Sequence, residues 1–187
     1  MLSRLQLESI GFAELGHNVQ ISERASFYGV NKICIGSNVR IDDFCVFAAG
    51  VGGIHIKNYV HIAVGASLIG AGSITLEDFS GLSSRVSVYS SSDDYSGHVL
   101  TNPTVPDIYK NVLHADVYIG RHVIVGSGSV ILPGVSLEEG VAIGALSLVR
   151  KNCEAFGIYA GNPARKIKER NRELLEMEKQ FLATKAG

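Results

Sequence analysis

The sequence predicts a mainly β fold: a parallel β-solenoid with one long loop and a C-terminal α-helix. Three observations predict it. Apolar residues recur at every sixth position, the recurrence is interrupted after every third repeat, and the end of the chain has a helical apolar pattern. An amphipathic helix would space apolar residues three and four apart, and a surface strand would alternate by two, so a six-residue period fits neither. A coil of stacked turns fits it.

The six-residue period is clearest between residues 119 and 154. The sequence there divides into IGRHVI, VGSGSV, ILPGVS, LEEGVA, IGALSL and VRKNCE. If three repeats make one triangular turn, each leading apolar residue lies beneath its equivalent eighteen residues later, and a continuous core column forms. Glycine after a leading residue relieves crowding at the corner. The leading residues are Ile119, Val125, Ile131, Leu137, Ile143 and Val149.

In the N-terminal half the same period is interrupted in a regular way. Leading residues keep six-residue steps within groups of three, and a longer step follows each group: Ile35, Ile41, Phe47; Ile56, Ile62, Leu68; Leu76, Leu82, Val88. On a three-sided coil, all these interruptions fall at one corner. The longest, residues 89–116, predicts a loop there, because SSSDDYSG and NPTVP are typical of turns rather than strands. Long loops on rigid scaffolds often carry function.

We expect residues 1–167 to form the coil with its loop, and residues 168–187 to form a helix and tail. Leu174, Leu175, Met177 and Phe181 would line one side of this helix among charged residues. The helix is expected to pack over the open end of the coil or to contact another subunit. Either arrangement would cover an exposed edge.

Composition excludes several classes of function. Seventeen basic and eighteen acidic residues give a formal charge of −1, which argues against a nucleic-acid partner. The N-terminus lacks the apolar run of a signal peptide, and no stretch of about eighteen apolar residues follows, so we expect a cytoplasmic protein without a membrane partner. Cys34, Cys45 and Cys153 are odd in number and irregularly spaced, which favours buried thiols in a reducing compartment.

The repeats, together with the ending AGNPARKIK, resemble the hexapeptide-repeat acyltransferase family, and in particular its galactoside and maltose O-acetyltransferase branch. The resemblance covers roughly residues 35–168. It implies a left-handed β-helix, a departure from the usual right-handed crossover. It also implies a homotrimer with active sites between neighbouring subunits, and acetyl-CoA as co-substrate. The N-terminal helical segment of the maltose enzymes is largely missing, which places the chain nearer the short members associated with surface polysaccharides.

The resemblance also assigns coenzyme contacts by motif. Small residues would let the backbone approach the two amides of the pantetheine arm, and basic residues would bind the phosphates. The alternatives are corner glycines that serve the coil alone and a solvated basic face. The matching residues are Gly126 and Ser127 in IVGSGS, Gly144 and Ala145 in AIGALS, Arg150 and Lys151 near the adenine and 3'-phosphate, and Gly161, Pro163, Ala164 and Arg165 in the ending.

The family's catalytic base is a histidine on the long loop, where imidazole can take up and return a proton near neutral pH. The matching position in VSVYSSSDDYSGH is Asp93. The candidates for the base are His114 and Asp93 first, then Asp94, and then His98 in the middle of the loop; an aspartate would need a raised pKa. Asp93 and Asp94 are expected to bind sugar hydroxyls, and Tyr95 to stack on the ring.

These observations lead to acetyl transfer from acetyl-CoA to a sugar hydroxyl, in the synthesis of a surface polysaccharide. The alternatives are N-acetylation of a nucleotide-linked amino sugar, since an amine needs less help from a protein base, and an inactive structural solenoid. A zinc enzyme built on the same coil would need three histidines. His55 and His61 are six apart, but no third histidine follows at a suitable spacing, so no metal is expected.

Overall fold

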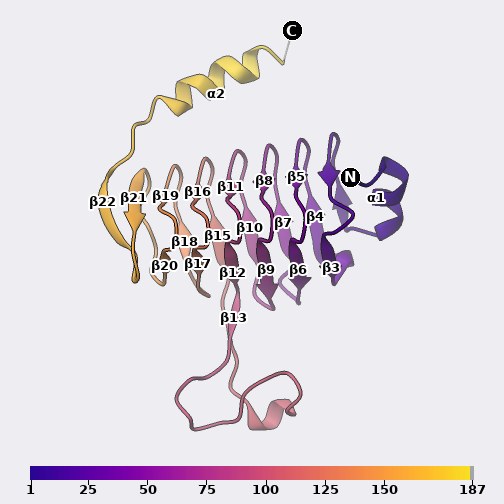
Figure 1. Ribbon diagram of the computed structural model, residues 1–187, viewed down its shortest axis with the longest axis vertical. Helices are drawn as coiled ribbons and strands as arrows, with labels where there is room; N and C mark the ends of the chain where they lie inside the picture. Colours follow the sequence, from indigo (N-terminus) through magenta and orange to yellow (C-terminus); the bar gives the residue numbers. More distant parts are fainter. Residues whose placement is uncertain (186–187) are drawn as a thin grey trace.

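The computed structural model describes residues 1–185. The chain forms a parallel β-solenoid of about seven turns with a long loop and a C-terminal helix (Figure 1). The predicted fold class, a left-handed parallel β-helix of hexapeptide repeats, is confirmed. Residues 186–187 of the expected C-terminal tail lie outside the described residues.

The coil has three faces, each a sheet of short strands stacked along the coil axis. The first face contains β1 (Glu14–Leu15), β4 (Ile33–Ile35), β7 (Ile54–Ile56), β10 (Ile74–Leu76), β15 (Val117–Ile119) and β18 (Ser136–Leu137). The second contains β2 (Gln20–Ile21), β5 (Arg40–Ile41), β8 (His61–Ile62), β11 (Gly81–Leu82), β16 (Ile124–Val125), β19 (Ala142–Ile143), β21 (Gly157–Ala160) and β22 (Arg165–Glu169). The third contains β3 (Ser26–Tyr28), β6 (Val46–Ala49), β9 (Ser67–Gly70), β12 (Ser87–Tyr89), β17 (Val130–Ile131) and β20 (Leu148–Val149).

The apolar residues that lead the repeats stack in register inside the coil. Leu76 pairs with Ile56 on one side and with Ile119 on the other, although the long loop separates Leu76 from Ile119 in the sequence. All the leading residues predicted from Ile35 to Val149 are buried. Phe27, which stacks beneath Phe47 one turn earlier, is partly buried. The hydrophobic core is therefore one continuous column along the axis.

The interruptions of the repeat all fall at the corner between the third and first faces, as predicted. They include η1 (Val30–Lys32), residues 50–53, residues 71–73 and the loop at residues 90–116. The loop extends away from the coil (Figure 1). Its stem is a pair of antiparallel strands, β13 (Ser91–Ser92) and β14 (Leu113–His114), which the turn-rich composition did not predict, and η2 (Asp107–Tyr109) lies within it.

The two ends of the coil are closed differently. At the N-terminal end, α1 (Arg4–Ile10) starts in a capping box between Ser3 and Gln6 and buries Leu7 against the core. At the other end β22 pairs antiparallel with β21 and covers its edge. Neither helix is long and apolar enough to cross a membrane, within residues 1–185.

The C-terminal helix α2 (Leu174–Ala183) does not pack over the open end, so that expectation is wrong. The helix runs back along the coil at the corner between the first and second faces (Figure 1). There Phe181 meets Tyr59 and Phe79 edge to face, and Glu178 lies 2.9 Å from Nε2 of His122. Stacked aromatic rings at this corner offer the helix an apolar surface, and β22 already occupies the end.

Candidate functional site

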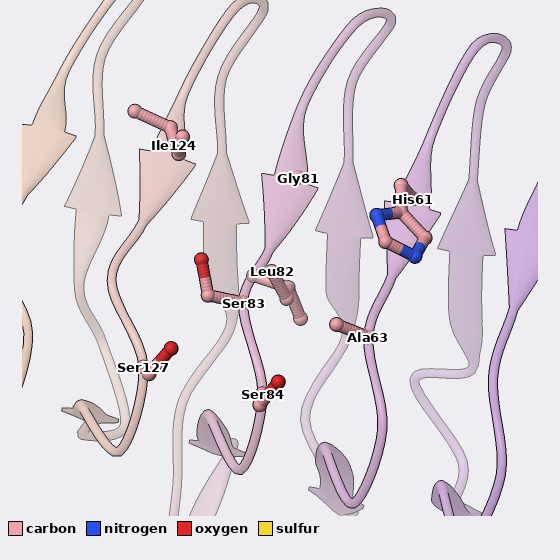
Figure 2. A pocket seen from close by; sticks show the side chains of 8 residues that line it. All are labelled: His61, Ala63, Gly81, Leu82, Ser83, Ser84, Ile124 and Ser127. Atoms are coloured by element: carbon pink, nitrogen blue, oxygen red, sulfur yellow. The ribbon is translucent and has the colours of Figure 1, made fainter.

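Two adjoining pockets form a groove along the corner between the second and third faces. The first has a volume of about 330 Å³ and is drawn in Figure 2; the second has about 510 Å³. Ser84 and Ser127 line both, so the two pockets form one surface, which we call the corner groove. Its other lining residues are His61, Ala63, Gly81, Leu82, Ser83 and Ile124 in the first pocket, and Val64, Arg85, Gly128, Ala145 and Leu146 in the second.

The turns of the coil place these side chains in a row. At this corner the turns that line the groove each contain a residue in the left-handed region, for example Arg85 at φ 59° and Leu146 at φ 56°, so the chain bends sharply. The residue just before each bend lines the groove. These residues are Val64, Ser84, Ser127 and Ala145, each one turn further along the axis.

Two of the four small residues expected to contact the coenzyme, Ser127 and Ala145, line the corner groove. Gly126 has a structural reason instead, because a Cβ there would come within 2.5 Å of the backbone nitrogen of Ala145 in the next turn. The carbonyl of Gly144 accepts hydrogen bonds from the hydroxyls of Ser129 and Ser147. The two glycines thus let neighbouring turns approach beneath the groove.

The three expected phosphate ligands, Arg150, Lys151 and Arg165, gather at the C-terminal end of the coil. They line one pocket of about 150 Å³, which we call the basic pocket. None of the three forms an ion pair with residues 1–185, whereas Lys166 beside them binds Glu154 at 3.0 Å and Glu169 at 2.8 Å. Uncompensated basic side chains around a pocket are suited to an anionic group. Its remaining lining residues are Val149, Asn152, Cys153, Tyr159 and Ala164.

Among the loop residues expected to bind the acceptor, Asp94 is the one whose side chain is fixed by hydrogen bonds. One carboxylate oxygen accepts the backbone N–H of Ser96 at 2.6 Å, and the other accepts the side-chain amide of Asn111 at 3.0 Å. These hydrogen bonds, from Ser96 first and then Asn111, lower the pKa of Asp94. Asp93 and Tyr95 are exposed. A low pKa suits Asp94 to accepting hydrogen bonds from a bound amine or hydroxyl rather than to removing a proton.

The two histidine candidates for the base have different surroundings. His114 lies on β14, where its Nδ1 is 2.7 Å from the hydroxyl of Ser91, and that hydroxyl also accepts the backbone N–H of Ala71. His114 lines a loop pocket of about 380 Å³ together with Asp107, Lys110, Asn111 and Val112. His98 is exposed in the middle of the loop.

Within one copy of the chain, the expected residues fall in three separate places. The corner groove, the basic pocket and the loop pocket share no residue. The loop leaves the coil at the corner between the third and first faces, whereas the groove follows the next corner. The loop candidates and the coenzyme candidates are therefore not brought into one pocket by a single chain.

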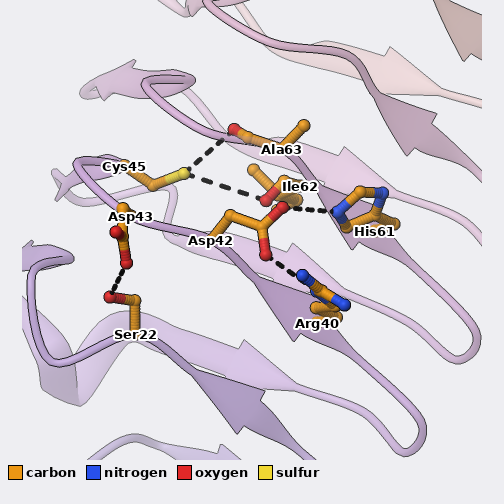
Figure 3. A network of polar contacts seen from close by, with 8 residues as sticks. All are labelled: Ser22, Arg40, Asp42, Asp43, Cys45, His61, Ile62 and Ala63. Carbon is orange, nitrogen blue, oxygen red and sulfur yellow. Dashed lines mark hydrogen bonds and ion pairs between the residues drawn. The ribbon is translucent and has the colours of Figure 1, made fainter. Parts of the chain in front are cut away.

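Sequence reasoning missed Ser83 and Ser84 and did not assign His61 to a site. Asp42 holds the imidazole of His61: its Oδ2 is 2.8 Å from His61 Nε2, and its Oδ1 accepts Nε of Arg40 at 2.7 Å (Figure 3). Partial burial alone would raise the pKa of Asp42, but the hydrogen bonds from Arg40 and His61 lower it. The sequence signal that could have identified this site is the run of small residues on the outside of these turns.

Two proteins that are similar over their full lengths decide the family. A dTDP-4-amino-4,6-dideoxy-D-glucose acyltransferase of Escherichia coli is 54% identical over 186 residues, covering 100% of this chain and 97% of its own length. The crystal structure of AntD, an N-acyltransferase from Bacillus cereus in complex with dTDP and 3-hydroxybutyryl-CoA, is 45% identical with a TM-score of 0.95, covering 100% of this chain and 98% of its own. The chain belongs to the hexapeptide-repeat acyltransferase family.

A more distant member of the hexapeptide-repeat acyltransferase family shares the fold. A maltose O-acetyltransferase from Clostridium difficile has a TM-score of 0.62 at 20% identity, covering 90% of this chain and 75% of its own. No protein-family model matches the sequence. Among residues 1–185, no three His, Cys, Asp or Glu side chains are grouped so that they could hold a metal ion.

Proposed function

We propose that the protein is an N-acyltransferase that moves an acyl group from acyl-CoA to the amine of a dTDP-linked 4-amino-4,6-dideoxyhexose. The observation that carries the proposal is the presence of both Ser84, in the corner groove, and Asp94, on the loop. Structures of AntD include variants in which Ser84 or Asp94 of that protein is replaced, with dTDP or dTDP-4-amino-4,6-dideoxyglucose and CoA bound. This chain carries Ser84 and Asp94 at the same numbers.

The amine acceptor also accounts for the lack of a histidine at position 93, where the O-acetyltransferases have their base and this chain has Asp93. A sugar hydroxyl must lose its proton as it attacks, which calls for a base near neutral pH. A neutral amine attacks the thioester carbonyl with its own lone pair; the new C–N bond forms, the C–S bond breaks, and the proton released by nitrogen goes to the departing thiolate. Asp94, an acceptor of lowered pKa, can orient the amine, and the hydroxyl of Ser84 can donate to the carbonyl oxygen.

The donor is proposed to lie along the corner groove toward the C-terminal end. Its pantetheine arm would pass Ser127 and Ala145, and its phosphates would reach Arg150, Lys151 and Arg165 in the basic pocket. The loop residues Asp93, Asp94 and Tyr95, with His114 and His98 as further candidates, would then come from a neighbouring copy in a homotrimer. The separation of loop and groove within one chain supports this arrangement.

A substrate panel tests the reaction. We expect CoA release with acetyl-CoA and dTDP-4-amino-4,6-dideoxyglucose, and none when dTDP-glucose or maltose replaces the amino sugar. Comparing acetyl-CoA with 3-hydroxybutyryl-CoA settles the acyl chain that the enzyme prefers. Turnover of a hydroxyl acceptor without turnover of the amino sugar would reject N-acylation in favour of O-acetylation.

Paired substitutions test the roles of the carboxylates. Asp94→Asn should lower kcat/KM by tenfold or more, because the amide presents an N–H toward the amine where the carboxylate accepted. Asp93→Asn, one residue away and without a fixed side-chain partner, is the matched comparison and should lower kcat/KM less than Asp94→Asn. The reverse result would assign the role to Asp93. His114→Ala and His98→Ala test for a protein base in the same assay.

Mixed trimers test whether the site lies between copies. Ser84→Ala and Asp94→Asn chains, each weakly active alone, are coexpressed with different tags and purified together. If a site takes Ser84 from one copy and Asp94 from the next, each trimer that contains both variants has one fully wild-type site, and activity returns to about a third of wild type. If both residues act within one chain, no mixed assembly regains activity.

A further inference from the structure

The first pocket of the corner groove contains a glycine that the fold does not need. Gly81 lies on β11, faces outward, and does not have a positive φ. A Cβ built there would meet nothing closer than the carbonyl oxygen of His61 at 3.7 Å, which is ordinary contact. Glycine weakens a strand, so an unneeded glycine in a strand often marks a place that a ligand approaches closely.

The missing side chain opens a slot between two neighbours. His61 on β8 and Ile124 on β16 pair with Gly81 from either side and face the same way (Figure 2). Neighbouring strands are about 4.8 Å apart, so His61 and Ile124 are attached about 9.6 Å from each other. A single ligand ring that lies between these two side chains, at a contact distance of about 3.5–4 Å from each, would fill this space. We call this space the Gly81 slot.

One wall of the slot is fixed in place. Each oxygen of Asp42 binds one partner, Arg40 at 2.7 Å and His61 at 2.8 Å (Figure 3). Because the carboxylate accepts from Nε2, that nitrogen of His61 carries the hydrogen, and Nδ1 of the neutral ring is left as an acceptor. The side chain of His61 is 53% exposed, so it remains accessible. The opposite wall, Ile124, is apolar and 48% exposed.

The position of the slot along the coil indicates which substrate it takes. The basic pocket and Ala145 lie toward the C-terminal end, and Ser84 and Ser127 lie at the junction of the two pockets. The Gly81 slot lies beside that junction on the second face, because Gly81 is on the turn of Ser84 and Ile124 is on the turn of Ser127, while His61 is one turn nearer the N-terminal end (Figure 2). A donor that enters from the basic pocket and presents its thioester at Ser84 leaves the slot for the acceptor.

We infer that the Gly81 slot binds the hexose ring of the acceptor, with Nδ1 of His61 accepting a hydrogen bond from a sugar hydroxyl and Ile124 packing on the apolar side of the ring. The inference rests on the proposed function and names the residues that select the sugar. Asp42 is a positioning residue, because it acts through His61. Gly81 sets the width of the slot, so the side chain at this position determines whether a ring is admitted.

Filling the slot is the test. Gly81→Val places a β-branched side chain in a strand, where it is favoured, so folding is expected to be preserved. The Kd of dTDP-4-amino-4,6-dideoxyglucose, measured by calorimetry, should rise by about tenfold or more, while the Kd of CoA stays within about twofold. Gln20→Val, at an outward position on the same face of the coil, is the matched control and should change neither constant.

Several outcomes would overturn the inference. Weaker binding of CoA rather than of the nucleotide sugar would assign the slot to the donor, and unchanged binding of both would leave it without a ligand. Loss of the native assembly in Gly81→Val, measured by light scattering, would show that a neighbouring copy fills the slot. If the wild-type protein does not bind the nucleotide sugar, both the slot and the proposed function are rejected. If it binds the nucleotide sugar but does not acylate it, only the proposed function is rejected.

A double-mutant cycle tests the role given to Asp42. His61→Ala and Asp42→Asn should each weaken binding of the nucleotide sugar, and the double variant should be no weaker than His61→Ala alone. Rescue is expected from His61→Gln, which keeps a side-chain acceptor at this wall. Additive losses would mean that Asp42 does not act through His61, and unchanged binding in His61→Ala would remove this wall from the site.

Discussion

Phe181 holds α2 on the coil, and its removal should release the helix without unfolding the solenoid. Phe181 is 38% exposed, so about 60% of its surface is buried, which contributes about 1–2 kcal/mol. It also meets Tyr59 at 5.3 Å and Phe79 at 6.2 Å, both edge to face. Two such pairs add about 1–3 kcal/mol. Phe181→Ala should therefore reduce the free energy of docking by about 2–5 kcal/mol.

Amide hydrogen exchange measures this change directly. A helix of ten residues is marginal in water by itself, so its amides are protected only while it is docked. A loss of about 2–5 kcal/mol corresponds to exchange about 30- to 4,000-fold faster in α2, with the coil strands unchanged. Met177→Ala, on the same helix but 56% exposed, is the control. Exchange within twofold of wild type in Phe181→Ala, or an equal effect in Met177→Ala, would refute the reasoning.

Three further predictions concern titration and packing. Burial, and then the charge of Arg121, lowers the pKa of His122, so the unfolded chain binds more protons at this residue than the folded one does. The contribution of His122 to the free energy of unfolding should fall as pH drops below 6.5 in denaturant titrations of the wild type and His122→Gln; a contribution that grows at low pH would contradict this. Burial raises the pKa of Cys153 to about 11, so about one thousandth of this thiol is thiolate at pH 8. Iodoacetamide should therefore label Cys153 only after unfolding, and rapid labelling in the native protein would contradict the raised pKa. Leu68→Ala, at a fully buried position, should lower the free energy of unfolding by about 2–5 kcal/mol in a denaturant titration; a loss below about 1 kcal/mol would mean that the core column can collapse around the gap.

The solenoid could be predicted because its information is local. Every turn repeats the same rule, and a strict period places Leu76 beneath Ile119 however long the loop between them is. The course of α2 could not be predicted in this way. The apolar side of the helix shows that it docks, but its partners, Tyr59, Phe79 and His122, come from three different turns and form a surface only after folding.

The site was only partly predictable for a similar reason. Arg150, Lys151 and Arg165 share a motif region and meet in one pocket, as expected. Ser84 has no motif of its own, and its place in the groove arises from stacking beside Ser127, 43 residues later. The function of the loop depends on a neighbouring copy in the arrangement proposed above, which one sequence describes only indirectly.

The confinement of every insertion to one corner makes the fold modular. Strands on both sides of the long loop pair as if the loop were absent, because β10 meets β15 in the same register in which it meets β7. The three residues at 71–73 make the same connection that residues 90–116 make one turn later. A chain in which that short connection replaces the long one should keep its coil and lose the loop to which the acceptor ligands are assigned in the proposed function. Such a scaffold could receive loops from other members of the family, so that substrate choice is exchanged at a single joint.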